Sequence, residues 1–227
     1  PVHDLMNPMV MPMIFRYRFH LSMLSAFLAA GTLAAQGPVS TPSASSATAK
    51  PDTARANPAA LIYGPRHAFT VRAPDTWTLD NSSGRRQGLQ AVFYPNGERW
   101  SASPAVMYCQ VIPRDQQIKD LAAMLDYDRN RYRNTSPNAV VADLPAVSFP
   151  SGKQATVRRF SGGPSGAIEQ TAYIEERTVI VLMILSCRNA EALDRALPAF
   201  SQFVRSYTFL ADDSENILRA VEAAQDE

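Results

Sequence analysis

The spacing of apolar residues changes along the chain, and these changes outline the expected elements. Residues 68–73, AFTVRA, alternate apolar and polar side chains, as a strand with one buried face does. Residues 179–186, VIVLMILS, are apolar at every position but the last, so we expect a strand buried on both faces at the centre of a sheet. Together the expected strands cover residues 68–73, 77–79, 89–94, 105–112, 139–142, 155–160, 167–175 and 178–186.

Elsewhere the apolar residues recur every three or four positions, which is typical of a helix with one buried stripe. Ile118, Leu121 and Leu125 share such a stripe, and we expect Asp115 to be the N-cap of that helix. Strands that come in runs separated by helices predict an α+β fold with a central, mainly antiparallel sheet flanked by helices on both faces. The expected helices cover about residues 115–133, 189–205 and 214–224.

The beginning of the chain has the layout of a cleaved export signal. Arg16 and Arg18 precede an apolar run, residues 21–33, which ends in small residues. This run is shorter than the about 20 apolar residues that a spanning helix needs. We therefore expect cleavage after Ala35 and a periplasmic or secreted protein with no membrane span after cleavage. An uncleaved N-terminal anchor is the alternative.

Composition divides the chain into four expected regions. A linker rich in alanine, serine, threonine and proline follows the signal, and it is too poor in large apolar side chains to favour an ordered structure. The remaining residues suffice for one domain with a single substantial core. The regions are upstream residues and signal peptide, 1–35; linker, 36–60; folded domain, 61–212; and C-terminal helix or tail, 213–227.

The charges are balanced. The chain has 22 basic and 21 acidic residues, and removing residues 1–35 takes away two arginines and one aspartate and leaves 20 of each. A neutral surface has no long-range field to attract nucleic acid or an anionic membrane. We therefore expect the partner to be another protein and expect no nucleic acid; the oligomeric state stays open.

Few residues point to catalysis. His67 is the only histidine after the signal, which excludes a zinc site with several histidines, and a hydrolase triad would need it as the base. A dyad of Ser151 and Lys153 needs a neutral lysine, whereas a lysine in a Pro-Ser-Gly turn is expected to be solvated. The glycine-rich residues 162–166 fit a hairpin loop better than a phosphate-binding loop. We expect no catalytic residue, metal site or cofactor.

A set of aromatic residues and arginines is the best candidate for binding a partner, because such residues commonly anchor interfaces. The alternative is that the tyrosines pack against a helix and the tryptophan caps a loop. Residues 127–134, YDRNRYRN, carry alternating charges that favour either an acidic partner or plain solubility. We place Asp120, Asp126 and Asp128 on the solvated face of that helix. The partner-binding candidates are Tyr94, Arg99, Trp100, Tyr108, Arg85 and Arg86.

The two cysteines, Cys109 and Cys187, are candidates for a disulfide. Exported proteins mature in an oxidising space, and two is the smallest even count. By the period of two, Cys109 points toward the core from its strand, and Cys187 ends the most apolar strand. If the two strands are neighbours, the cysteines are expected to pair; two separate buried thiols are the alternative.

Two segments resemble the Mog1/PsbP-like superfamily, including exported bacterial proteins of the DcrB and DUF1795 type. Residues 69–77, FTVRAPDTW, combine an aromatic strand with Pro-x-x-Trp, and residues 200–207, FSQFVRSY, resemble a final helix that runs into a Ser-aromatic ending. The resemblance covers about residues 61–210 and implies an α/β/α sandwich without a catalytic motif.

The resemblance and the signal together lead to an expected function. We expect an exported, non-enzymatic binding or interaction module, such as an envelope accessory or a toxin-protection protein. The alternatives are a structural assembly factor of an envelope complex and a hydrolase with an irregular site.

Overall fold

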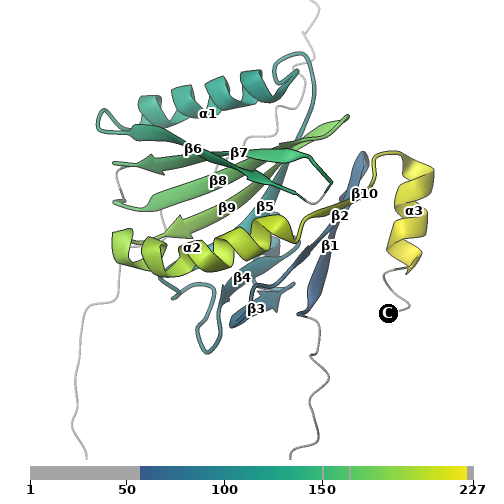
Figure 1. The fold of residues 1–227 in the computed structure, drawn as a ribbon, viewed down its shortest axis with the longest axis horizontal. Helices are drawn as coiled ribbons and strands as arrows, with labels where there is room; N and C mark the ends of the chain where they lie inside the picture. The colour runs from purple at the N-terminus through teal and green to yellow at the C-terminus, as the bar shows by residue number, and fades with distance from the viewer. Residues whose placement is uncertain (1–56, 150, 164, 224–227) are drawn as a thin grey trace, which may run out of the picture. The chain divides into compact units, whose positions relative to one another are not determined.

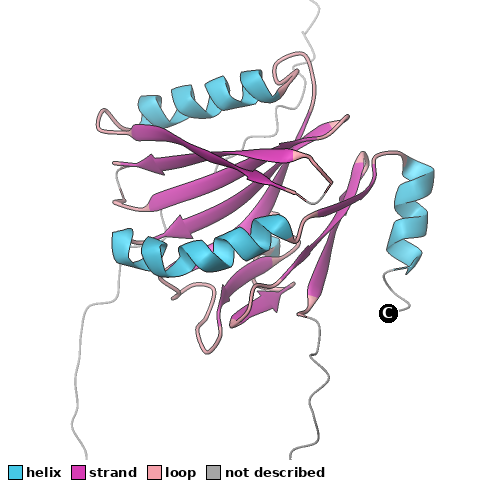
Figure 2. Ribbon diagram, in the orientation of Figure 1, coloured by secondary structure: helices cyan, strands magenta, loops and turns pink. Residues whose placement is uncertain are grey.

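The structure, a computed structural model, describes residues 57–149, 151–163 and 165–223. The expected signal and most of the expected linker, residues 1–56, lie outside the described residues. Figures 1 and 2 show the elements, and no helix among the described residues is long and apolar enough to cross a membrane. In chain order the elements are β1 (Ala59–Gly64), β2 (His67–Arg72), β3 (Trp77–Asp80), the 3-10 helix η1 (Arg85–Gln87), β4 (Val92–Pro95), β5 (Ala105–Pro113), α1 (Leu121–Thr135), β6 (Val140–Ser148), β7 (Gln154–Ser161), β8 (Ile168–Glu175), β9 (Val179–Cys187), α2 (Ala190–Arg205), β10 (Thr208–Ala211) and α3 (Ser214–Ala223).

The strands form two antiparallel sheets. Seven strands pair in the order β3-β4-β5-β9-β8-β7-β6, and three pair in the order β1-β2-β10. Helices α1 and α2 pack against opposite faces of the larger sheet, so the expected α+β fold with helices on both faces is confirmed. The structure also has a second, smaller sheet, because β1 and β10 were not among the expected strands. Strand β1 begins at Ala59, two residues inside the expected linker, and β10 has only four residues directly after α2.

Strand β9 lies at the centre of the larger sheet, as its apolar sequence predicts. Val181, Met183 and Leu185 join the core beneath α2. Ile180 and Leu182 join the second core, which α1 covers. Because both faces of β9 are covered, neither face of this strand tolerates a polar residue, which explains the unbroken apolar run.

Helix α1 begins later than the spacing of its apolar residues predicted. Asp120 is its N-cap and accepts a hydrogen bond from the Ala123 N–H at 2.8 Å. Asp115, the expected N-cap, instead accepts hydrogen bonds from the N–H groups of Gln117 and Ile118, each at 2.8 Å. Asp115 therefore caps a turn that precedes the helix. An aspartate can cap either a turn or a helix, so the residue type alone did not show which of Asp115 and Asp120 begins α1.

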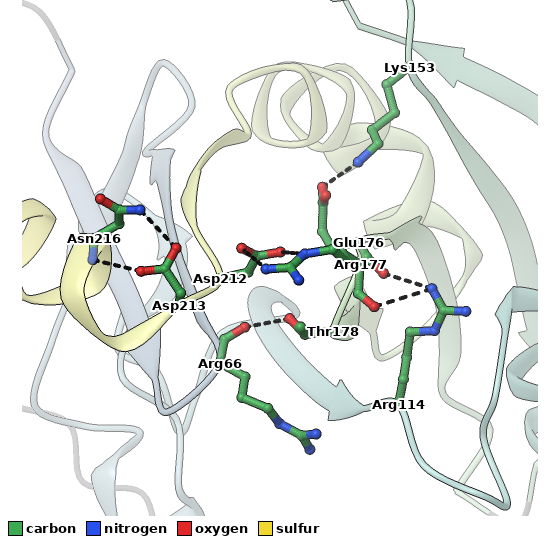
Figure 3. Close-up of polar contacts among 9 residues, drawn as sticks. All are labelled: Arg66, Arg114, Lys153, Glu176, Arg177, Thr178, Asp212, Asp213 and Asn216. Carbon is green, nitrogen blue, oxygen red and sulfur yellow. Dashed lines mark hydrogen bonds and ion pairs between the residues drawn. The ribbon is translucent and has the colours of Figure 1, made fainter.

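The tip of the β8–β9 hairpin binds the smaller sheet and its surroundings through polar contacts (Figure 3). The Glu176 carboxylate, 8% exposed, lies 2.6 Å from Lys153 Nζ and accepts a hydrogen bond from the Tyr207 hydroxyl at 2.9 Å. Arg177 donates two hydrogen bonds to Asp212, both at 2.7 Å. Tyr207 and Asp212 flank β10, so these contacts fasten the central hairpin to the smaller sheet.

A second contact joins the two sheets at β1. The Gln90 side-chain amide accepts a hydrogen bond from the Tyr63 N–H at 3.0 Å and donates one to the Tyr63 carbonyl at 2.6 Å. This pair of bonds occupies the outer edge of β1 as a neighbouring strand would. Gln90 lies just before β4, between the buried residues Leu89 and Ala91. The backbone that carries its side chain is therefore anchored in the core of the larger sheet.

The expected disulfide between Cys109 and Cys187 is wrong. Both cysteines are free and buried, and they lie on neighbouring strands as expected. In the ladder, however, Cys109 pairs with Met183 and Cys187 pairs with Ala105. The cysteines are four residues apart along the strands, roughly 13 Å at about 3.4 Å per residue, whereas a disulfide needs Cα atoms within about 7 Å.

Thiol titration tests this register. We expect two free thiols in the denatured, unreduced monomer and slow reaction in the native protein, because both thiols are buried. Burial raises the pKa of the Cys187 thiol to about 12 and that of the Cys109 thiol further, which suppresses the reactive thiolates. A monomer with no titratable thiol after denaturation would contradict the register.

Candidate partner-binding surface

Helix α1 covers only part of its face of the larger sheet. The helix contacts β6 and β8, whereas β3, β4 and β5 lie at the other end of the strand order. On that part of the face, Tyr94, Trp100 and Val106 are only partly buried and pack against the core that α1 covers. The uncovered part of the α1 face is therefore apolar and partly accessible.

Three of the predicted candidates come together there. The Trp100 ring meets the Tyr108 ring edge-on, with centroids 6.2 Å apart and an angle of 85° between the planes. Tyr108 is 6% exposed, and the hydroxyl of Tyr94 donates a hydrogen bond to Asp80 at 3.0 Å. Tyr108 is thus a core residue, as the alternative interpretation held, and it supports Trp100 from below.

The predicted arginines do not join this group. Arg85 and Arg86 lie in η1, which precedes β4, whereas Arg99 lies in the loop that follows β4. The two loops are at opposite ends of that strand, and all three side chains are exposed. Arg85 Nε donates to the Asn81 carbonyl at 2.8 Å, which orients the side chain along its own loop.

A buried polar cluster lies between α1 and the sheet. Asp128 is 3% exposed, accepts a hydrogen bond from the Tyr173 hydroxyl at 2.7 Å and forms an ion pair with Arg131 at 3.0 Å. The expectation that Asp128 is solvated was therefore wrong. It shares the inward side of α1 with Met124, and the hydroxyl and the guanidinium meet the charge that burial would otherwise leave unpaired.

Glu169 of β8 lies next to the same cluster and contacts a second aromatic pair, Tyr132 and Phe160. It accepts a hydrogen bond from the Tyr132 hydroxyl, and the Tyr132 ring stacks on Phe160 at 4.2 Å between centroids. Burial raises the pKa of Glu169 to about 7, with Arg131 opposing the shift and Asp128 adding to it. The sequence analysis did not single out Glu169. The signal was present, because residues 169, 171 and 173 alternate along β8 and therefore lie on the same face as Tyr173, which α1 covers.

Tyr108 is within electrostatic reach of this cluster. Burial raises the pKa of Tyr108 well above its usual range, the Glu169 charge raises it further, and Arg131 opposes the shift. Tyr108, which contacts Trp100, therefore feels the charges of Glu169 and Arg131 across the intervening strand β9.

The outer flank of α1 carries a shallow, open depression of about 410 Å³. Tyr127 lies in it with 41% of its surface exposed, and Arg131 lies beside it with 42% of its side chain exposed. A tyrosine and an arginine in an open hollow are residue types that commonly anchor protein interfaces. The residues that line it are Tyr127, Asn130, Arg131, Asn134 and Thr135, all within the expected interaction segment 127–134 or next to it.

In the described part of the chain, His67 and Lys153, the residues considered for catalysis, contact aromatic or charged residues rather than a nucleophile. The His67 ring lies 6.0 Å from the Phe69 ring at the start of β2, and burial lowers its pKa. Lys153 forms an ion pair with the buried Glu176, so the expectation of a solvated lysine was incomplete. The described residues contain no group of three or more side chains of the kinds that bind metal ions.

The chain is similar in fold to several solved structures of other proteins. No protein-family profile and no curated protein matches the chain. Cyanobacterial PsbP from Synechocystis is 12% identical with a TM-score of 0.45 over 71% of this chain and 98% of its own. The Ran-binding protein Mog1p from Saccharomyces cerevisiae is 14% identical with a TM-score of 0.45 over 71% and 98%.

A third similar structure is LpqN of Mycobacterium tuberculosis, described as involved in cell envelope biogenesis. It is 15% identical with a TM-score of 0.45 over 67% of this chain and 90% of its own. The similar structures thus include a Mog1 and a PsbP protein, whose superfamily the sequence resembles. At these identities and TM-scores the likeness carries no argument about function, and it does not bear on the narrower DcrB and DUF1795 types.

The buried cluster predicts a contrast between two tyrosines. Changing Tyr173→Phe removes the hydroxyl that meets Asp128, so we expect the free energy of unfolding to fall by about 1–3 kcal/mol. Tyr127→Phe on the same helix–sheet unit removes an exposed hydroxyl and serves as the matched control, with no measurable change expected. Urea unfolding measures both, and equal values for the two variants would contradict a buried, hydrogen-bonded Asp128.

Proposed function

We propose that the protein is a non-enzymatic module that binds another protein through the α1 side of its larger sheet. The surface combines the depression on α1, with Tyr127 and Arg131, and the partly buried Trp100 beyond it. The observation that carries the proposal is the exposure of Tyr127, 41%, beside a half-exposed arginine in an open hollow. Tyrosine and arginine are among the residue types that most often anchor protein interfaces.

The charges on this flank suggest the chemistry of the partner. Arg129 and Arg131 form ion pairs with Asp126 and Asp128, and the Arg131 side chain is 42% exposed although its partner Asp128 is buried. Arg99 is exposed in the loop beside Trp100. A partner with acidic side chains around an apolar or aromatic residue fits this distribution, because charged rims steer association and apolar centres stabilise it.

Export to the periplasm or out of the cell is part of the proposal and rests on residues 1–35 alone. An exported binding module suits an accessory role in the envelope or protection against a toxin. A structural assembly factor of an envelope complex is the alternative, and it differs in that the partner would remain bound through purification.

Photo-crosslinking tests the surface directly. We expect p-benzoylphenylalanine at position 127 to form a crosslink to a defined protein in envelope extract, and the additional change Trp100→Ala to reduce its yield severalfold. The same crosslinker at position 218 is the matched control, because Leu218 is also an exposed apolar residue, 63% exposed, but lies on α3. The same crosslinked proteins from positions 127 and 218 would contradict the proposed surface.

A further inference from the structure

Beneath α1, Asp128 and Glu169 are both within reach of the charge of Arg131, whose side chain is 42% exposed. Arg158 is committed to Asp143 at 2.5 Å and to the Leu125 carbonyl at 2.7 Å. Arg131 is committed to Asp128 at 3.0 Å. This leaves Glu169 without a cation of its own in the described part of the chain.

Among the described residues, the hydrogen bond to the Glu169 carboxyl comes from a neutral group, the hydroxyl of Tyr132 on α1. A protonated Glu169 leaves Asp128 and Arg131 as a balanced ion pair, whereas an ionised one adds a second carboxylate beside Asp128. Placing an unpaired charge between a helix and a sheet is costly, so ionisation of Glu169 opposes the packing of α1.

We propose that the proton on Glu169 is a pH-sensitive latch, which holds α1 against the sheet at acidic pH and loosens it as the pH rises toward and just past 7. The raised pKa of Glu169, about 7, agrees with this geometry. The titratable and charged groups on the same face, from each strand and helix packed there, are Asp128, Arg131 and Tyr132 of α1, Tyr108 of β5, Asp143 of β6, Arg158 of β7, and Tyr173 and Glu175 of β8.

The neighbours do not cancel the effect. Glu175 lies at the far end of β8, where it accepts a hydrogen bond from the Leu121 N–H at 3.2 Å and faces Arg114 at 3.4 Å. Burial raises the pKa of both Tyr108 and Tyr173 above its usual range, so neither phenol ionises near neutral pH. Between pH 6 and pH 8 neither phenol therefore changes charge, whereas Glu169, with a pKa of about 7, does.

The sign of the pH dependence follows from linkage. A carboxyl whose pKa is raised in the docked state stabilises docking fully at pH below its ordinary value, and this contribution is lost as the pH rises toward 7. The pKa of Glu169 is about 7 when α1 is docked, and we take its ordinary value of about 4.3 for the detached state. With these values, the equilibrium constant for detachment of α1 rises about tenfold from pH 6 to pH 8.

Hydrogen exchange of the α1 amides measures this equilibrium without any partner, so its result is independent of the proposed binding surface. After correction for the intrinsic effect of pH on exchange, we expect protection in α1 to fall about tenfold from pH 6 to pH 8, while α2 is unchanged. In Glu169→Gln, which is neutral at both pH values and still accepts from Tyr132, the dependence should disappear. Glu222→Gln, an exposed change on α3, should retain it.

Two results would overturn the latch. One is an α1 protection that is the same at pH 6 and pH 8 in the unchanged protein, and the other is a Glu169→Gln variant that keeps the tenfold change. If that variant does not fold, a carbon-13 titration of the Glu169 carboxyl in the unchanged protein decides the matter: a midpoint near 7 supports the latch, and one near 4 overturns it.

Discussion

The buried carboxylate of Glu176 is the contact on which the joining of the two sheets depends. It lies at the turn of the central β8–β9 hairpin and is 8% exposed, so its charge must be met within the protein. Lys153 and Tyr207 meet the same carboxylate oxygen, at 2.6 and 2.9 Å. The Tyr207 ring packs on Phe69 of β2, with centroids 5.1 Å apart, and Tyr207 precedes β10 directly. Through Tyr207, the Glu176 carboxylate therefore couples the larger sheet to two strands of the smaller sheet. It reaches β2 through the ring contact with Phe69, and β10 because Tyr207 directly precedes it in the chain.

The two faces of the larger sheet are covered unequally, and this difference gives the molecule its candidate surface. Beneath α2 the sheet is closed by a continuous apolar core that includes Phe69 and Phe203. Beneath α1 the contact is partly polar, through Asp128 and Glu169, and the helix leaves Trp100 partly accessible. The same polar cluster therefore underlies both the proposed binding surface and the proposed dependence of α1 packing on pH.

Local patterns in the sequence predicted most of the longer strands well and the polar contacts poorly. The apolar run in β9 and the alternation in β2 fix elements whose burial follows from one strand alone. The failed disulfide shows the limit, because the distance between Cys109 and Cys187 depends on the register of two strands that no local pattern sets. Likewise, the aromatic group was predicted, but the burial of Asp128 and the environment of Glu169 depend on how α1 docks, which residues in other elements determine.

A double-mutant cycle tests the central claim, that Glu176 couples the elements around it. The changes Glu176→Gln and Tyr207→Phe are made singly and together, and the free energy of unfolding is measured in urea. The exposed pair Glu191 and Arg195 on α2, 2.7 Å apart, is the matched control, for which a coupling below about 0.5 kcal/mol is expected. We expect a coupling of about 1–2 kcal/mol between Glu176 and Tyr207, and effects that simply add, as in the control, would contradict this coupling.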